Sequence, residues 1–103
     1  MSNFLLELAK IIESKKSEDP KKSYTSSLLD KGFDKCLDKF KEESEEFSAA
    51  IKNNTNIVYE SADVIYHFLV TLEARGVKLI DVITELERRK NQSGLEEKKN
   101  RIK

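Results

Sequence analysis

Helix-breaking residues, tryptophan and cysteine are scarce or absent in this chain of 103 residues. It contains one proline, three glycines and no tryptophan, whereas charged residues make up 37%. Because so few residues interrupt helices, the composition favours helix over a turn-rich β fold. The only cysteine, Cys36, cannot form an internal disulfide, and no Cys/His spacing resembles a zinc site. This cysteine usage fits a reducing compartment, and we expect a soluble, cytoplasmic protein.

Neither an excess of one charge nor a long apolar run is present. Lys and Arg total 19 and Asp and Glu total 19, so the formal net charge is zero. Such a chain lacks the basic field of a dedicated nucleic-acid-binding protein. No apolar run approaches the roughly 18 residues that span a bilayer, and Glu7 and Lys10 interrupt the first apolar stretch too early for a signal peptide. We therefore expect neither nucleic acid nor a membrane as a partner.

Apolar residues recur at helical spacing along most of the chain. This spacing predicts helices over about 3–15, 34–52, 56–75 and 79–90, with a short helical turn over 24–29. The Asn and Thr side chains of residues 53–56 are expected to cap the following helix, and Gly76 to stop it. The last helix is expected to bury Leu79, Val82, Ile83 and Leu86. We predict one all-α domain over 1–103, with a basic tail over about 92–103 that is a candidate for a flexible segment ordered by a ligand or partner.

Acidic side chains interrupt the most apolar predicted helix, at 56–75. Glu60, Asp63 and His67 fall on one narrow strip of it, at spacings i, i+3 and i+7. Carboxylates on such a helix are costly to desolvate unless a cation or hydrogen-bond donors compensate them. His67 itself fits a hydrogen-bonded interior histidine, supporting the carboxylates, better than a metal ligand.

The preceding predicted helix carries a matching acidic set on neighbouring faces, formed by Glu42, Glu43 and Glu46. Helices joined by a short turn should pack antiparallel, with position 46 about level with 63, and 43 or 42 with 67. Hard oxygen ligands in that number suit magnesium or manganese rather than zinc. The residues thus indicate a divalent-cation site that handles a polyphosphate, without naming the substrate.

A simpler alternative for the glutamates stays open at this point. Glu-rich helices are common, and these side chains would then form a solvated face that pairs with Lys39 and Lys41. Cys36 lies on the apolar stripe of its helix and is expected in the core rather than as a nucleophile.

The spacing of the acids resembles a known signature. Glu42-Glu43-x-x-Glu46, thirteen residues, then Glu60-x-x-Asp63 is similar to the EExxE…ExxD metal signature of the all-α, MazG-like nucleoside triphosphate pyrophosphatases. Within that superfamily, Ser23-Tyr24-Thr25 and the tail Ser93-Gly94-x-x-Glu97-Lys98-x-x-Arg101 resemble the phosphoribosyl-ATP pyrophosphohydrolase family. Such a resemblance implies hydrolysis of phosphoribosyl-ATP to phosphoribosyl-AMP and pyrophosphate, the second step of histidine biosynthesis.

The resemblance also implies roles for individual residues. The metal ligands would be Glu43, Glu46, Glu60 and Asp63, holding Mg²⁺ or else Mn²⁺. Glu42 would orient or deprotonate the attacking water. The substrate would be held by Lys39, Tyr24, Arg89, Lys98 and Arg101, with the tyrosine ring stacked on a base. For the tail residues the alternative is a solvated charge run, and for Tyr24 it is an anchor of the preceding loop in the core.

Burial predicts a homodimer. The 56–75 helix is apolar on more sides than three short helices cover, so two copies would share a four-helix core built from 34–52 and 56–75. The family resemblance implies the same assembly. Two rival functions remain open: a MazG-like house-cleaning pyrophosphatase that acts on other nucleoside triphosphates, and a non-catalytic helical interaction module whose acids serve solubility.

Overall fold

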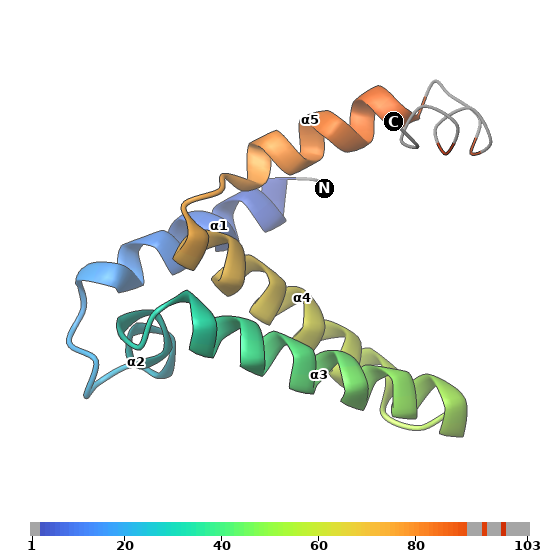
Figure 1. The fold of residues 1–103 in the computed structure, drawn as a ribbon, viewed down its shortest axis with the longest axis horizontal. Helices are drawn as coiled ribbons and strands as arrows, with labels where there is room; N and C mark the ends of the chain where they lie inside the picture. Colours follow the sequence, from blue (N-terminus) through green and yellow to red (C-terminus); the bar gives the residue numbers. More distant parts are fainter. Residues whose placement is uncertain (1–2, 91–93, 95–97, 99–103) are drawn as a thin grey trace.

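The computed structural model describes residues 3–90, 94 and 98, and over 3–90 it contains helices and no strand (Figure 1). The elements in chain order are α1 (Asn3–Ser14), the short 3-10 helix η1 (Lys15–Ser17), α2 (Tyr24–Asp30), α3 (Phe33–Asn53), α4 (Ile57–Arg75) and α5 (Leu79–Arg89). The all-α prediction is confirmed, and the observed helix ends lie within about one residue of the predicted ones.

Local sequence explains where two of these helices begin or end. Ser23 precedes α2 with extended backbone, and its hydroxyl oxygen accepts a hydrogen bond from the Ser26 amide at 3.1 Å. Gly76 follows α4 with φ 82°, a left-handed conformation that glycine adopts without a steric penalty. The prediction that Gly76 stops this helix is confirmed.

The turn between α3 and α4 differs from the prediction in its hydrogen bonding. Asn54 (φ 55°) and Asn56 (φ 53°) both adopt the left-handed conformation, which asparagine tolerates better than most residues. Asn56 makes no side-chain hydrogen bond to α4, so the predicted capping by Asn and Thr side chains is wrong. Asn54 and Asn56 permit the left-handed path of the backbone in this turn.

The antiparallel hairpin of α3 and α4 is the centre of the molecule, and α1 crosses α4 near its carboxyl end (Figure 1). The buried core lies where α1, α2, α3 and α4 meet, and consists of Ile12, Leu28, Cys36, Leu69 and Val70. Cys36 is fully buried, and its thiol lies 3.4 Å from the carbonyl oxygen of Leu28. The expectation that Cys36 is a core residue is confirmed.

The helix α5 leaves this core as an arm and packs mainly against α1 (Figure 1). The prediction that α5 buries four apolar residues is wrong: Leu86 is 58% exposed, and Leu79, Val82 and Ile83 are half-buried. Apolar side chains of α4 are also exposed, with Val58 84% accessible. One copy of the chain therefore leaves apolar surface uncovered. None of the described helices combines the length and apolar character that a membrane crossing requires.

Candidate metal centre

Three carboxylates meet between the two helices of the hairpin. Glu43 comes from α3, while Glu60 and Asp63 lie one turn apart on α4. Each offers an oxygen within 4.8 Å of the oxygens of the other two. Glu43 is only 6% exposed, and the two α4 acids are half-buried. Three negative groups are thus gathered at the edge of the core.

Within the described part of the chain, this cluster is not fully compensated by donors. Glu43 Oε1 and Glu60 Oε1 are buried and have no hydrogen-bond partner there. Burial raises the pKa of Glu60, and the negative charges of Glu46, Asp63 and Glu43 raise it further. A divalent cation would compensate buried carboxylate oxygens that have no hydrogen-bond donor. Their hard oxygen chemistry fits Mg²⁺ or Mn²⁺.

One lysine borders the cluster. Lys39 Nζ lies 3.2 Å from Glu42 Oε1 and 3.3 Å from Glu43 Oε2, so it pairs with one oxygen of Glu43 and leaves the other unpaired. Hydrogen bonding to Glu42 and Glu43 raises the pKa of Lys39. Glu42 is exposed and fits the alternative of a solvated, lysine-paired face, whereas the buried Glu43 does not.

The fourth predicted ligand, Glu46, is exposed and lies outside the three-carboxylate group. It borders Glu60, with which it lines a pocket of about 250 Å³ beside the α3–α4 turn. The predicted register, with 46 level with 63, is therefore wrong, because Glu43 meets Glu60 and Asp63 while Glu46 borders Glu60. The reason is that the turn folds back on α3: the Thr55 amide donates to the Ala50 carbonyl at 3.1 Å.

His67 lies behind the cluster rather than in it. Its Nδ1 is 2.9 Å from the backbone carbonyl oxygen of Asp63, and its Nε2 is 3.2 Å from the Tyr24 hydroxyl. His67 is 6% exposed, as expected for an interior histidine with hydrogen-bond partners. Two roles were expected for Tyr24, an anchor of the preceding loop and a contact with the substrate, and its position fits both. Its hydroxyl contacts His67 and anchors α2, while Tyr24 remains 57% exposed.

Tyr66 makes a contact that was not predicted from the sequence. Its hydroxyl is hydrogen-bonded to that of Thr25, which is 5% exposed. A tyrosine on an apolar helix needs a partner for its hydroxyl, and this is the signal that could have indicated the contact.

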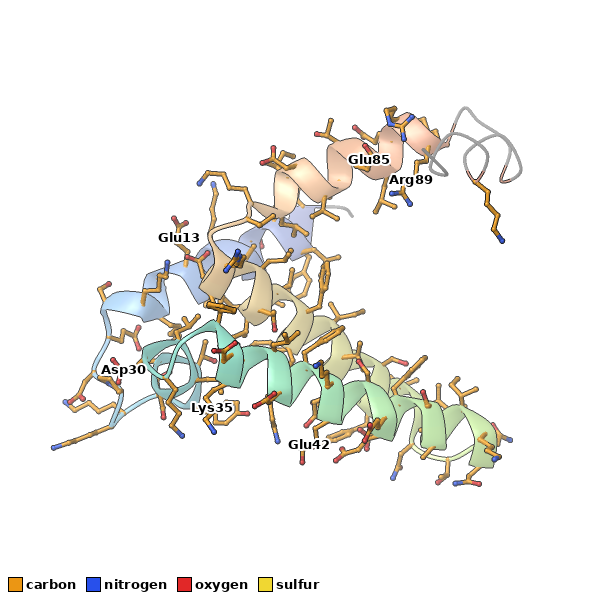
Figure 2. All side chains as sticks on the ribbon, in the orientation of Figure 1. Glu13, Asp30, Lys35, Glu42, Glu85 and Arg89 are labelled. Atoms are coloured by element: carbon orange, nitrogen blue, oxygen red, sulfur yellow. The ribbon has the colours of Figure 1, made fainter. Side chains whose placement is uncertain are left out.

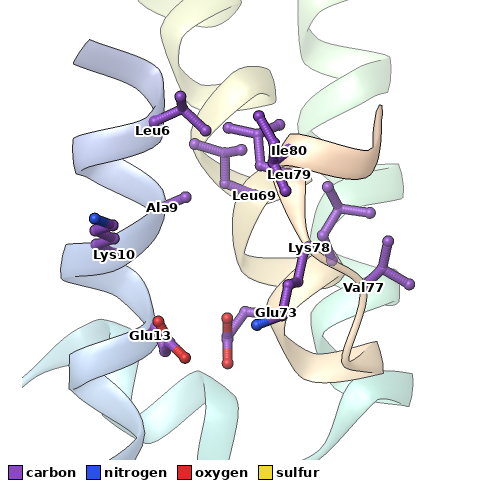
Figure 3. Close-up of a pocket in the computed structure, with 11 residues that line it drawn as sticks. Leu6, Ala9, Lys10, Glu13, Leu69, Glu73, Val77, Lys78, Leu79 and Ile80 are labelled. Carbon is purple, nitrogen blue, oxygen red and sulfur yellow. The ribbon is translucent and has the colours of Figure 1, made fainter. Parts of the chain in front are cut away.

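Among the predicted cations beyond Lys39, the structure does not bring Arg89 to the carboxylates of its own chain. Arg89 Nε lies 3.0 Å from Glu85 Oε2 near the free end of α5, well separated from Glu42 on α3 (Figure 2). Lys98 is exposed, and Arg101 lies outside the described residues. A pocket between α1 and the α4–α5 turn (Figure 3) is lined by apolar and charged side chains and by none of the cluster acids.

An antiparallel helical hairpin with carboxylates facing across it defines an all-α protein of the MazG-like fold. A family model described as Phosphoribosyl-ATP pyrophosphohydrolase matches residues 5–90, which is most of the chain. The chain therefore belongs to the phosphoribosyl-ATP pyrophosphohydrolase family.

Curated relatives agree with this assignment. A phosphoribosyl-ATP pyrophosphatase of Rhodobacter capsulatus is 49% identical over 96 residues, covering 91% of this chain and 93% of its own length. One from Ruegeria pomeroyi is 48% identical over 103 residues, covering 98% of both chains. One from Hydrogenovibrio crunogenus is 46% identical and covers 100% of this chain and 97% of its own. Family membership makes the chain an enzyme of histidine biosynthesis that hydrolyses a phosphoanhydride bond of phosphoribosyl-ATP.

Proposed function

We propose that the reaction takes place at the carboxylates of the α3–α4 hairpin and depends on Mg²⁺, with Mn²⁺ as a substitute. The observation that carries this proposal is the pair of buried oxygens, Glu43 Oε1 and Glu60 Oε1, that have no hydrogen-bond partner in the described structure. With Asp63 they form an oxygen donor set of the kind that hard divalent cations take in enzymes acting on phosphates. When bound, the ion would supply positive charge against the developing charge on the phosphates.

Four residues of the chain would hold the ion. Glu43, Glu60 and Asp63 contribute the oxygens already within 4.8 Å of one another. Glu46 borders Glu60 and would join them from the neighbouring pocket. Glu42 is proposed to orient or deprotonate the water that attacks the α-phosphorus, after which pyrophosphate leaves. Its exposure at the rim of the cluster leaves it accessible to such a water.

Lys39 is the cation best placed to bind the substrate phosphates. It is held at the rim by Glu42 and Glu43, and its ammonium can exchange part of that pairing for phosphate oxygens. Tyr24, whose side chain is largely exposed next to it, would contact the rest of the nucleotide.

We further propose a homodimer that shares the α3 and α4 helices, because strongly exposed apolar side chains such as Val58 and Ile51 lie on these helices. Arg89, Lys98 and Arg101 would then hold phosphates in the site of the other subunit, since Arg89 lies away from Glu42 on the hairpin of its own chain. We also propose that residues 1–103 form a single domain and that the enzyme is cytoplasmic.

The test is pyrophosphate release from phosphoribosyl-ATP by the full chain, with Mg²⁺ and with the ion removed by a chelator. We expect turnover that requires Mg²⁺ and is restored by Mn²⁺, with little turnover of ordinary nucleoside triphosphates. Equal turnover with the chelator would refute the metal requirement. A preference for ordinary triphosphates would refute the substrate.

A further inference from the structure

Two consecutive residues at the start of α2 reach two consecutive residues of α4. The Tyr24 hydroxyl lies 3.2 Å from His67 Nε2, and the Thr25 hydroxyl is hydrogen-bonded to that of Tyr66. The two contacts join the same pair of helices and differ in their surroundings. Thr25 is 5% exposed, whereas Tyr24 is 57% exposed and leaves much of its side chain open to a ligand.

The hydrogen bonds of His67 fix the direction of the Tyr24 hydroxyl. The Asp63 carbonyl oxygen can only accept, so His67 Nδ1 donates to it across 2.9 Å. In the neutral imidazole, Nε2 is then an acceptor, and the Tyr24 hydroxyl must donate to it. The phenolic proton is therefore engaged by His67, and the lone pairs of the phenolic oxygen remain available.

His67 links this phenol to the metal centre, because its Nδ1 contacts the backbone carbonyl oxygen of Asp63. Burial raises the pKa of Tyr24, the positive charge of Lys39 opposes that shift, and the negative charges of Glu43 and Glu42 add to it. The phenol therefore lies one histidine away from Asp63 of the candidate site, and its oxygen is a hydrogen-bond acceptor.

We propose that Tyr24 and His67 form a specificity-determining pair in which the Tyr24 oxygen accepts a hydrogen bond from a sugar hydroxyl or an amine of the substrate. The inference rests on the proposed function. Phosphate oxygens carry few protons at neutral pH, so an acceptor-only phenol does not bind them and instead recognises the nucleoside or phosphoribosyl part. His67 is a positioning residue, because it acts through Tyr24.

Steady-state kinetics with phosphoribosyl-ATP test this pair. Tyr24→Phe removes the acceptor and is expected to raise KM about three- to tenfold, with kcat within about twofold of wild type. The reason is that a hydrogen bond far from the reacting phosphorus is made equally in the ground state and the transition state. His67→Phe should have a similar effect, and the double variant no more than either single one. His67→Gln, whose amide oxygen can accept from Tyr24, should recover most of the affinity.

Tyr66→Phe is the matched control, since it removes a phenolic hydroxyl that joins the same two helices but is hydrogen-bonded to the buried Thr25 rather than to His67. It is expected to lower thermal stability about as much as Tyr24→Phe and to leave KM unchanged. A substrate prepared from 2′-deoxy-ATP tests one of these donors, the 2′-hydroxyl of the adenosine. The effect of Tyr24→Phe disappears on this substrate if the 2′-hydroxyl is the donor, and persists if another hydroxyl or an amine is.

The single histidine of the chain allows a direct measurement of the hydrogen-bond direction. In ¹⁵N NMR of the folded protein at neutral pH, His67 should show a protonated Nδ1 and an unprotonated Nε2. The Nε2 resonance should shift in Tyr24→Phe and stay in place in Tyr66→Phe.

An unprotonated Nδ1, or a KM for Tyr24→Phe equal to that of wild type, would overturn the proposal. A parallel loss of kcat in Tyr24→Phe and Tyr66→Phe would reduce the contact to a structural one and overturn it as well. These outcomes are distinct from failure of the proposed function, in which the wild-type chain itself releases no pyrophosphate with Mg²⁺.

Discussion

Glutamates on the α3–α4 hairpin and on α5 experience opposite environments. On α5, Glu85 lies 2.7 Å from Arg88 and 3.0 Å from Arg89, and these arginines lower its pKa to about 2. On the hairpin, burial and neighbouring acids raise the pKa of Glu60, and its Oε1 has no donor within the described structure. The sequence predicts helices with acidic residues in both regions, the α3–α4 hairpin and α5. Acids therefore indicate a metal site when packing buries carboxylate oxygens without hydrogen-bond donors, rather than when acids are merely numerous.

The largest effect should come from neutralising the hairpin acids. Glu43→Gln and Asp63→Asn are each expected to reduce pyrophosphate release by about a hundredfold or more, since each removes a metal ligand. Circular dichroism should show unchanged helical content. Glu85→Gln, which neutralises an acid on α5 that is paired with arginines, should keep a near-wild-type rate. Retained turnover in Asp63→Asn would contradict the assigned role.

The effect of Mg²⁺ on the free energy of unfolding should depend on the hairpin acids. Mg²⁺ at a hundred times its dissociation constant should stabilise the wild-type chain by about 2.7 kcal/mol. The same concentration should leave Glu60→Gln nearly unaffected. Without metal, Glu60→Gln should be the more stable chain, because a buried carboxylate that repels its neighbours has been neutralised. Thermal unfolding with and without Mg²⁺ measures both effects. An apo Glu60→Gln less stable than wild type would show that the acids are already compensated.

Glu42 should give an intermediate result. It is exposed and paired with Lys39, so Glu42→Gln removes a group that orients water without removing a buried ligand. We expect kcat to fall about tenfold, which corresponds to about 1.4 kcal/mol, while Mg²⁺ affinity stays close to that of wild type. Calorimetric titration alongside the kinetics distinguishes this from metal loss. A change in affinity as large as that of Asp63→Asn would make Glu42 a ligand instead.

The smallest expected effect is the pH dependence of stability that comes from the Glu85 ion pairs on α5. Because folding lowers the pKa of Glu85 from 4.5 to about 2, its ion pairs contribute stability above about pH 4.5, and this is lost as the pH falls toward 2. The pairs are exposed, so the contribution should be slight and weakened by salt. Thermal unfolding of wild type and Glu85→Gln should differ a little at pH 7 and converge near pH 2. A difference that grew with acidity would have the wrong sign.

Much of the fold could be predicted because its signals are local. Helical spacing of apolar residues located the α-helices within residues 3–90, and Gly76 located the end of α4. The i, i+3 spacing of Glu60 and Asp63 placed both on one face, where the structure brings Glu43 to them. These features depend on residues within one or two turns of each other.

The features that the sequence did not predict depend on long-range geometry. The register of Glu46 follows from a turn that folds back on Ala50, a backbone path that asparagine permits without dictating it. The exposure of Leu86 follows from the direction in which α5 leaves the core. The contact between Thr25 and Tyr66 spans 41 positions in sequence. Periodicity carries no information about such distances.

Calorimetric titration of Mn²⁺ into the substrate-free protein tests most directly whether the hairpin acids hold a divalent cation. We expect saturable binding by the wild-type chain, at least tenfold weaker binding by Asp63→Asn, and wild-type binding by Glu85→Gln. Equal affinity of Asp63→Asn and wild type would contradict the assignment of the metal centre to α3 and α4.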